Sequence, residues 1–272
     1  MSDNPTSSPA GEPPHATISE AEGILTVMIN RPKKLNAISP EVTAALWEAA
    51  TLLSERTDLR CMVITATGKY FTVGIDLAAT RAKHDSRPAD WDVHGSWNYR
   101  RDYRQHHLLY DEFETIEKPI ILAAQATCLG AGTEMAVSCD FRFCTPETEW
   151  ALPEIQLGVI SGSGGSSRLT RIVGVAWAKW IAMAGKRVGA EQAKTIGLVH
   201  DVFPAETFMD EVYAFCRELC KIPHDALGTA KLAIDIAGDV PDRGVMRHFD
   251  RVANQGLVEG PEFKRRTQAF YK

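Results

Sequence analysis

Several familiar signatures are missing from this sequence, and each absence excludes a class of protein. No run of eighteen apolar residues occurs, so we expect no membrane-spanning helix and no membrane partner. Positive charge is not in excess: the formal net charge is -5 at pH 7, which argues against nucleic acid as the main partner. The six cysteines form no CxxC pair, and such scattered thiols indicate a reducing, cytoplasmic location and no metal site.

The ends of the chain differ in character from its middle. The first 15 residues lack the basic and apolar segments of a signal peptide, and we expect them to form a disordered tail. The remaining length is enough for one large core, or for one core with a small appendage. The pattern favours a core over residues 16–204 and a helical region over residues 205–272.

Strand-like and helix-like segments alternate through this core. Residues 15–20 and 24–30 predict a hairpin around Glu22-Gly23, and Ser39-Pro40 predicts the start of a helix. Residues 80 to about 107 show no clear periodicity and are expected to form a surface excursion or lid. Further strands are expected at 60–66, 119–130, 140–146 and 198–204, and further helices at 131–140, 165–174, 175–185 and 189–197. The alternation predicts an α/β fold with appended helices.

Three glycine-bearing turns stand out, "FTVGIDL" (71–77), "LGAGTE" (129–134) and "SGSGG" (161–165). None fits the Walker A loop or the dinucleotide-binding GxGxxG pattern. The first two turns each end a strand and open a helix, so backbone N–H groups at two helix N-termini could converge on one point. Such a pair of donors stabilises a developing negative oxygen without a charged side chain.

Two carboxylates lie where the hydrophobic pattern predicts burial. Glu134 follows the second glycine turn, and Glu154 stands in "LPEI" among apolar neighbours. Either residue alone has an ordinary structural explanation, because an acid in a first helical turn favours the helix dipole and a loop acid can be partnered. Beside two potential oxyanion donors, they together indicate an acid/base pair. Asp76 of the first turn is expected to cap its helix.

Five segments in a fixed order make the sequence resemble the crotonase, or enoyl-CoA hydratase/isomerase, family over roughly residues 16–270. They are "INRPKKLNAIS", "YFTVGIDL", "KPIILAAQATCLGAGTEMAVSCD", "WALPEIQLGVISGSGGSSRL" and "GAEQAKTIGLVHDVFP". The resemblance implies the crotonase (ClpP-like) fold of stacked β-β-α units with a C-terminal helical region used for oligomerisation. It also implies a homotrimer or dimer of trimers and an acyl-CoA substrate, with no separate cofactor because coenzyme A is part of that substrate.

The resemblance also assigns roles to individual residues. The thioester oxygen is expected between the backbone N–H groups of Ile75 and Ala131, and Ala131 can serve only if its φ is negative. Val73 and Ala131 stand where alanine and glycine are usual in the family. Glu134 and Glu154 match the two glutamates of the hydratases. Glu154 is expected to exchange the proton at Cα, and Glu134 to hold and activate water.

Coenzyme A needs cations for its phosphates and a backbone groove for its adenine, and the resemblance places "NRPKK" where the family meets the nucleotide. The residues expected to contact coenzyme A are Arg31, Lys33, Lys34, Val73 and Asp76. Lys264 and Arg265 from a neighbouring subunit are further candidates.

The presence of both glutamates favours an enoyl-CoA hydratase, which adds water across the double bond of a 2-enoyl-CoA. Family members with other reactions differ at these positions; dienoyl-CoA isomerases, for example, carry an aspartate where this chain has Gly162. Isomerisation, C–C cleavage or hydrolysis of a CoA thioester stays open as an alternative. A non-catalytic acyl-CoA or RNA-binding homologue is disfavoured by the acidic balance and by the two acids.

Overall fold

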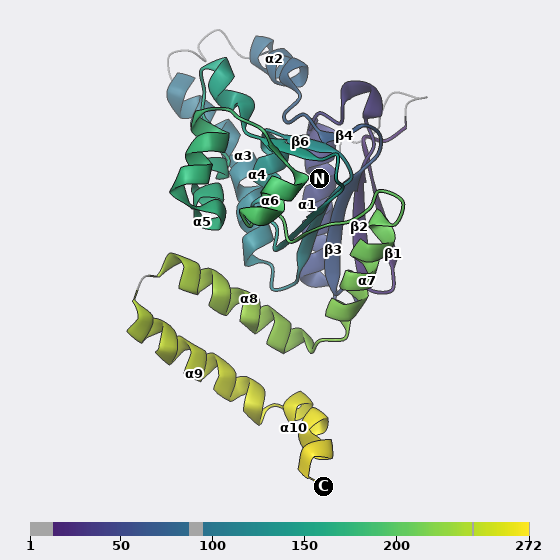
Figure 1. The fold of residues 1–272 in the computed structure, drawn as a ribbon, viewed down its shortest axis with the longest axis vertical. Coiled ribbons are helices and arrows are strands. Elements are labelled where there is room, and N and C mark those ends of the chain that lie inside the picture. The colour runs from purple at the N-terminus through teal and green to yellow at the C-terminus, as the bar shows by residue number, and fades with distance from the viewer. Residues whose placement is uncertain (1–12, 87–94, 241, 272) are drawn as a thin grey trace, which may run out of the picture.

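Figure 1 shows the fold in the computed structural model, which describes residues 13–86, 95–240 and 242–271. A six-stranded sheet has the spatial order β1-β2-β3-β5-β7-β10. The antiparallel pair β1–β2 forms one edge, and all other neighbours in this sheet run parallel. Its strands are β1 (Ala16–Ala21), β2 (Ile24–Ile29), β3 (Cys61–Ala66), β5 (Ile120–Ala124), β7 (Phe141–Cys144) and β10 (Asp201–Val202).

A smaller sheet carries the strands that lead into the glycine turns. Its spatial order is β4-β6-β8-β9, in which the first three strands run parallel and β9 is antiparallel to β8. The strands are β4 (Tyr70–Thr72), β6 (Thr127–Leu129), β8 (Glu149–Ala151) and β9 (Val188–Gly189). Because parallel neighbours end at the same edge, the segments after β4, β6 and β8 emerge side by side.

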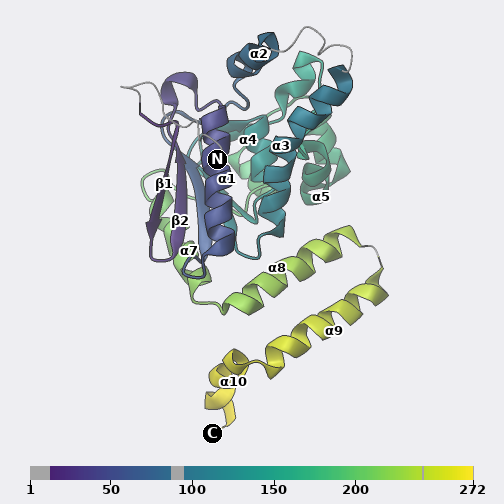
Figure 2. The ribbon, with the colours of Figure 1, turned by 180° about the vertical axis from the view of Figure 1, so that it is seen from behind.

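Helices cover both faces of the large sheet, with α1 and α7 on opposite sides (Figures 1 and 2). The helices are α1 (Pro40–Glu55), α2 (Leu77–Asp85), α3 (Gly95–Thr115), α4 (Ala131–Ala136), α5 (Gly165–Ala178), α6 (Ala190–Thr195), α7 (Phe208–Cys220), α8 (His224–Asp239), α9 (Arg243–Glu259) and α10 (Pro261–Thr267). Alternate residues of the central strands therefore enter two different cores. In β3, Met62 and Ile64 pack on the α1 side, whereas Cys61 and Val63 pack on the α7 side.

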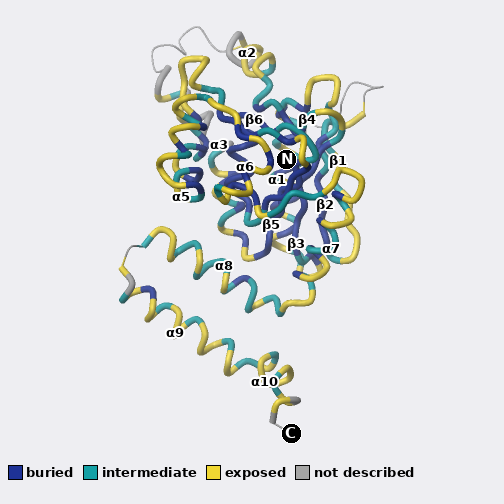
Figure 3. Tube along the Cα trace, viewed as in Figure 1, coloured by how far each residue is buried: buried dark blue, intermediate teal, exposed yellow. Residues whose placement is uncertain are grey.

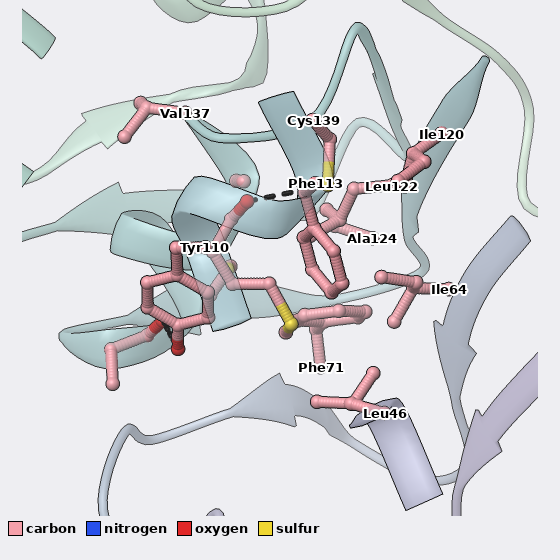
Figure 4. Packing of buried hydrophobic residues seen from close by; sticks show 14 of the residues in the cluster. Leu46, Ile64, Phe71, Tyr110, Phe113, Ile120, Leu122, Ala124, Val137 and Cys139 are labelled. Atoms are coloured by element: carbon pink, nitrogen blue, oxygen red, sulfur yellow. Dashed lines mark hydrogen bonds between the residues drawn. The ribbon is translucent and has the colours of Figure 1, made fainter. Parts of the chain in front are cut away.

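The larger core joins the two sheets. Figure 4 shows Ile64 of β3 near Leu46 of α1 and Phe71 of β4, with Tyr110 and Phe113 of α3 in the same cluster. All five side chains are almost completely buried. Figure 3 shows how burial varies along the chain: buried residues are concentrated in the sheets, intermediate residues are frequent in α8, and exposed residues dominate α9 and α10.

Several sequence predictions are confirmed because they depend on local chemistry. Glu22 and Gly23 both have positive φ, at 54° and 78°, as a tight hairpin turn between β1 and β2 requires. Ser39 caps α1 by accepting the N–H of Val42, with Pro40 as the first helical residue. The predicted α/β class and the helical C-terminal section are also confirmed.

Two predictions are wrong in their details. Residues 80–85 and 95–107 are not irregular: the first range belongs to α2 and the second to the long helix α3. The apolar residues Leu109, Tyr110 and Phe113 anchor the C-terminal half of α3 in the core. Residues 119–130 are not one strand: β5 lies in the large sheet and β6 in the small one, because the chain changes sheets at Gln125 and Ala126. Residues 1–12 of the predicted tail and 87–94 of the predicted excursion lie outside the described residues.

The C-terminal helices α8, α9 and α10 extend away from the two sheets (Figures 1 and 2). They carry apolar side chains that are largely exposed in the single chain, including Ile234, Val245 and Val252. Across residues 13–86, 95–240 and 242–271, no helix has both the length and the apolar character needed to span a bilayer.

Candidate active site

The two glycine turns that follow β4 and β6 are in direct contact. A Cβ atom placed on Gly74 would lie 3.3 Å from the backbone nitrogen of Ala131 and 3.4 Å from the carbonyl oxygen of Leu129. Gly74 and Gly130 both have positive φ, at 98° and 57°, which lets each turn reverse without a side chain between them. The backbone nitrogens of Ile75 and Ala131 are therefore carried by touching turns, as the sequence predicts.

Both backbone N–H groups are available to a ligand. Ile38 bonds to the carbonyl of Gly74 and to the N–H of Asp76, so the N–H of Ile75 between them points the other way. Ala131 is the first residue of α4, where an N–H has no acceptor within the helix. Neither N–H has a hydrogen-bond acceptor in the described part of the chain. Ala131 has a helical conformation with negative φ, which meets the condition set by the sequence.

Close packing fixes α4 against the small sheet. The Thr133 hydroxyl bonds to the carbonyl of Cys128 in β6 at 2.9 Å and of Ala151 in β8 at 3.0 Å. A Cβ on Gly132 would come within 2.1 Å of the Thr72 methyl group in β4, so only glycine fits there. The start of α4 is thereby tied to all three parallel strands.

Glu134 lies in α4 and is buried, with 3% of its surface exposed. Its Oε1 atom accepts the backbone N–H of Ser163 at 2.7 Å and of Gly165 at 3.3 Å. Burial, and then the nearby Glu154 carboxylate, raise the pKa of Glu134 to about 7, against the opposing effect of the two N–H donors. This carboxyl is therefore able to hold or release a proton near neutral pH.

Glu154 is half-buried in the 3-10 turn η3 (Pro153–Leu157), which follows β8. Its Oε2 atom accepts the hydroxyl of Ser161 at 3.0 Å. Its Oε1 atom faces the glycine turn after β6, because a Cβ on Gly130 would lie 2.9 Å from it. Burial raises the pKa of Glu154, while its own backbone N–H and the Ser161 hydroxyl act in the opposite direction.

The two carboxyls are thus arranged in the same way. One oxygen of each is held by protein donors, and the other oxygen has no hydrogen-bond donor among the described residues. The structure brings Glu134, Glu154, Ile75 and Ala131 together at the edge where β4, β6 and β8 end. Two proton-exchanging groups beside two aligned N–H donors are suited to reactions that pass through an enolate.

The residues expected to contact coenzyme A have different surroundings. Arg31 is largely buried, and its Nη1 atom donates to the carbonyl of Ala37 at 2.6 Å and to Asp76 at 3.0 Å. Asp76 also accepts the N–H groups of Ala78 and Ala79, which confirms the predicted helix cap. Arg31 and Asp76 therefore tie the loop before α1 to the turn that carries Ile75.

The remaining candidates for coenzyme A contact are more accessible. Lys33 and Lys34 are exposed on the 3-10 turn η1 (Pro32–Lys34), and Val73 is half-buried in the glycine turn after β4. Lys264 and Arg265 are exposed on α10, where Arg265 pairs with Glu262. The four cations among them can approach a bound anion without disrupting the core.

A family model described as Enoyl-CoA hydratase/isomerase matches residues 19–270. The chain belongs to this family. As a crotonase-family enzyme, it resembles hydratases in particular. A crotonyl-CoA hydratase from Syntrophomonas wolfei is 28% identical over 235 residues, which cover 86% of this chain and 84% of the relative. A 2,3-dehydroadipyl-CoA hydratase from Escherichia coli is 30% identical over 217 residues, which cover 80% of each chain.

The crotonase fold is confirmed by comparison with solved structures. An enoyl-CoA hydratase from Bacillus anthracis superposes with a TM-score of 0.84 at 26% identity, covering 94% of this chain and 96% of that one. An enoyl-CoA hydratase from Geobacillus kaustophilus gives a TM-score of 0.83 at 26% identity, covering 94% of this chain and 95% of that one.

This crotonase also contains site residues that sequence reasoning missed. Ser161 bonds to Glu154, and the buried Arg168 of α5 donates to the Ser163 carbonyl at 3.1 Å and to Glu114 of α3 at 2.7 Å. Arg168 thereby supports the peptide segment that holds Glu134. The glycines of "SGSGG" were the available signal, because a Cβ on Gly164 would come within 1.9 Å of Arg168.

Proposed function

We propose that this crotonase is an enoyl-CoA hydratase, which adds water across the double bond of a 2-enoyl-CoA thioester. The observation that carries the proposal is the pairing of two carboxyls, Glu134 and Glu154, each with one oxygen held and one oxygen available. Hydration moves a proton from water to Cα, and a pair of acids around one water can activate that water and carry the proton. The names of the hydratases that the chain resembles add support.

In this reaction the thioester carbonyl oxygen accepts the N–H groups of Ile75 and Ala131. Negative charge moves onto that oxygen as the water oxygen bonds to Cβ. Two fixed backbone dipoles stabilise the enolate without reorganising during the step, which lowers the barrier. Neither side chain takes part, so isoleucine and alanine are suitable at these positions.

The protons are handled by the two acids. Glu154, as a carboxylate, takes a proton from the water while the water oxygen adds to Cβ. Glu154 then gives that proton to Cα, and the thioester carbonyl re-forms. Glu134 holds the water in place through its available oxygen and activates it for the attack. One water thus supplies both the hydroxyl and the hydrogen, and both carboxyls return to their starting state.

Coenzyme A is proposed to contact the glycine turn after β4 and the loop that precedes α1. The exposed cations Lys33 and Lys34 are suited to bind its phosphates. Arg31, Val73 and Asp76 are proposed to contact coenzyme A where it passes the turn that carries Ile75. Lys264 and Arg265 of a neighbouring subunit are proposed as further contacts.

The proposed assembly is a homotrimer or a dimer of trimers. Its support is the exposed apolar surface of the C-terminal helices, which includes Ile234, Val245, Val252 and Phe263. Light scattering coupled to size exclusion is expected to give three or six subunits. A purely monomeric protein at micromolar concentration would contradict the assembly but not the chemistry.

Six free thiols, five of them buried, support the proposed cytoplasmic location.

Hydration of crotonyl-CoA, and of longer and aromatic 2-enoyl-CoAs, tests the function directly. Loss of the enoyl-thioester absorbance together with a 3-hydroxyacyl-CoA product supports the proposal. Conversion to a 3-enoyl-CoA with no hydroxyl added would make the enzyme an isomerase instead. Glu154→Gln protein, assayed at equal concentration, excludes a contaminating hydratase.

A further inference from the structure

Ser161 has a buried hydroxyl that is hydrogen-bonded to a carboxyl of the candidate active site. It has 6% of its surface exposed, and its Oγ atom donates to Oε2 of Glu154 at 3.0 Å. Ser161 stands beyond the 3-10 turn that carries Glu154, in the loop that leads to α5. A hydrogen bond donated to a carboxylate favours its charged form.

The position of this bond makes the two oxygens of Glu154 inequivalent. Oε2 is taken by Ser161, whereas Oε1 lies against Gly130, directly before Ala131. A carboxyl that lost the Ser161 bond could rotate about its terminal torsion, because this torsion is broad. Ser161 therefore fixes the orientation of the carboxyl, with its second oxygen directed at the Gly130 turn.

Charged groups near Glu154 influence whether its carboxyl is ionised. Glu134 of α4 is close enough to Glu154 to interact electrostatically, and the positive charge of Arg168 in α5 opposes the resulting rise in the pKa of Glu134. Two neighbouring carboxyls cannot both ionise easily, so the donors around each one decide which gives up its proton first. Glu134 is the more buried of the two, and Glu154 has the side-chain hydroxyl donor.

We propose that Ser161 is a positioning residue, whose hydroxyl keeps Glu154 as the ionised partner of the pair and turns its Oε1 atom toward the substrate Cα. This proposal rests on the proposed function, in which Glu154 moves a proton between water and Cα. Ser161 itself does not touch the reacting atoms. Its effect reaches them through the charge and the orientation of Glu154.

The first test titrates the carboxyls directly and needs no activity. In protein labelled with 13C at the glutamate carboxyls, the Glu154 resonance is identified by its loss in Glu154→Gln. Ser161→Ala is expected to raise the pKa of Glu154 by about half a unit or more, because a donor to the charged form is removed. Ser161→Cys, which keeps a weaker donor, should give an intermediate value. An unchanged Glu154 pKa in Ser161→Ala would overturn the proposal.

The second test measures kcat, KM and the pH dependence of kcat/KM. Ser161→Ala is expected to lower kcat by about tenfold with KM nearly unchanged, and to move the acidic limb of the profile upward. Thr148→Val is the matched control, because Thr148 is a fully buried hydroxyl that bonds to the Ala124 carbonyl away from the site. An acidic limb that moves equally in both variants would reduce Ser161 to a structural role.

The two tests distinguish a failure of the proposed function from a failure of the role proposed for Ser161. A wild-type enzyme that hydrates no 2-enoyl-CoA contradicts the proposed function, and the carboxyl titration still decides whether Ser161 controls the charge of Glu154. An active wild-type enzyme whose Ser161→Ala variant retains its pH profile and its carboxyl pKa values contradicts the role of Ser161 alone.

Discussion

Gly74 packs directly on the backbone nitrogen of Ala131, leaving 3.3 Å between that nitrogen and the position of a Cβ atom. The contact joins two turns that are distant in the sequence and neighbouring in space. It means that the N–H groups of Ile75 and Ala131 are held by the same packed interface. The first prediction tests whether these two groups act through the backbone alone.

Ala131→Pro removes one N–H donor and is expected to lower kcat by about a hundredfold or more. Proline is tolerated at the first position of a helix, so α4 should persist and the thermal midpoint should change little. Ile75→Ala keeps its N–H and should leave turnover within about tenfold, a barrier change of about 1.4 kcal/mol. Equal and small effects of both substitutions would place the thioester oxygen elsewhere.

Glutamine variants of the two acids separate a hydratase from an isomerase. Glu134→Gln and Glu154→Gln should each lower kcat for hydration by at least about a hundredfold, because glutamine at 154 cannot carry the proton and glutamine at 134 cannot activate the water as a carboxyl does. The double variant should be little worse than either single one, since both acids address one water. The measurement is kcat for all three variants on a 2-enoyl-CoA and on its 3-enoyl isomer. A Glu134→Gln enzyme that hydrates at a nearly wild-type rate would refute the two-carboxyl mechanism.

The raised pKa of Glu134 predicts a pH-dependent cost to stability. Its pKa is about 7 when folded, against an ordinary value of 4.5, so the folded state binds this proton more tightly than the unfolded state. The stabilising effect of the bound proton is complete below pH 4.5 and is lost as the pH rises to about 7, a change of about 3 kcal/mol. Glu134→Gln should therefore raise the thermal midpoint at pH 8, and this increase over the wild type should become progressively smaller as the pH is lowered toward 5.

The control for this stability prediction is Glu48→Gln, because Glu48 is a solvent-exposed residue of α1. Its effect on the thermal midpoint is expected to be small at both pH values. A Glu134→Gln protein that is less stable than the wild type at pH 8 would show that the carboxylate is well accommodated and not strained by burial.

Substitution of the exposed lysines tests the proposed nucleotide site. Lys33→Ala combined with Lys34→Ala should raise KM for an acyl-CoA more than for an acyl-pantetheine that lacks the nucleotide. Phosphate contacts stabilise the bound ground state and the transition state equally, so kcat should stay nearly unchanged. If both substrates respond identically, the phosphates are bound elsewhere, and Lys264→Ala with Arg265→Ala becomes the next pair to measure.

Arg31 should behave differently from these lysines. Its bonds to Ala37 and Asp76 hold the turn that carries Ile75, so Arg31→Met is expected to lower kcat severalfold for both acyl-CoA and acyl-pantetheine. Asp76→Asn should reproduce part of the loss while keeping an acceptor for the α2 cap. An effect of Arg31→Met confined to KM for the nucleotide-containing substrate would instead make Arg31 a direct phosphate ligand.

The features that could be predicted from the sequence depend on neighbouring residues. The turn at Glu22-Gly23, the cap at Ser39 and the cap at Asp76 each need only a few adjacent side chains and backbone groups. The two acids were recognisable because a carboxylate in an apolar run needs an explanation. Their partners were harder to find, since Ser161 and Arg168 gain their importance from contacts across the fold.

The wrong predictions concern segments whose structure depends on distant residues. The first half of α3 shows little apolar periodicity, and its helix continues from a C-terminal half that is anchored in the core. Residues 119–130 are mostly apolar, so periodicity could not show that the chain passes from the large sheet to the small one. Pairing with separate neighbours, β3 and β7 for β5 but β4 and β8 for β6, divides this segment.

The parallel ladder β4-β6-β8 has a consequence for how this enzyme can change over evolutionary time. Each strand delivers one component of the site just past its last residue: Ile75 after β4, Ala131 after β6 and Glu154 after β8. Replacing a side chain there alters the chemistry while the ladder is preserved. Inserting or deleting one residue in any of the three strands shifts a component along the ladder by about 3.3 Å, more than a hydrogen bond tolerates. New activities on this scaffold should therefore arise by substitution at the strand ends, with length variation confined to segments such as the connection between α2 and α3.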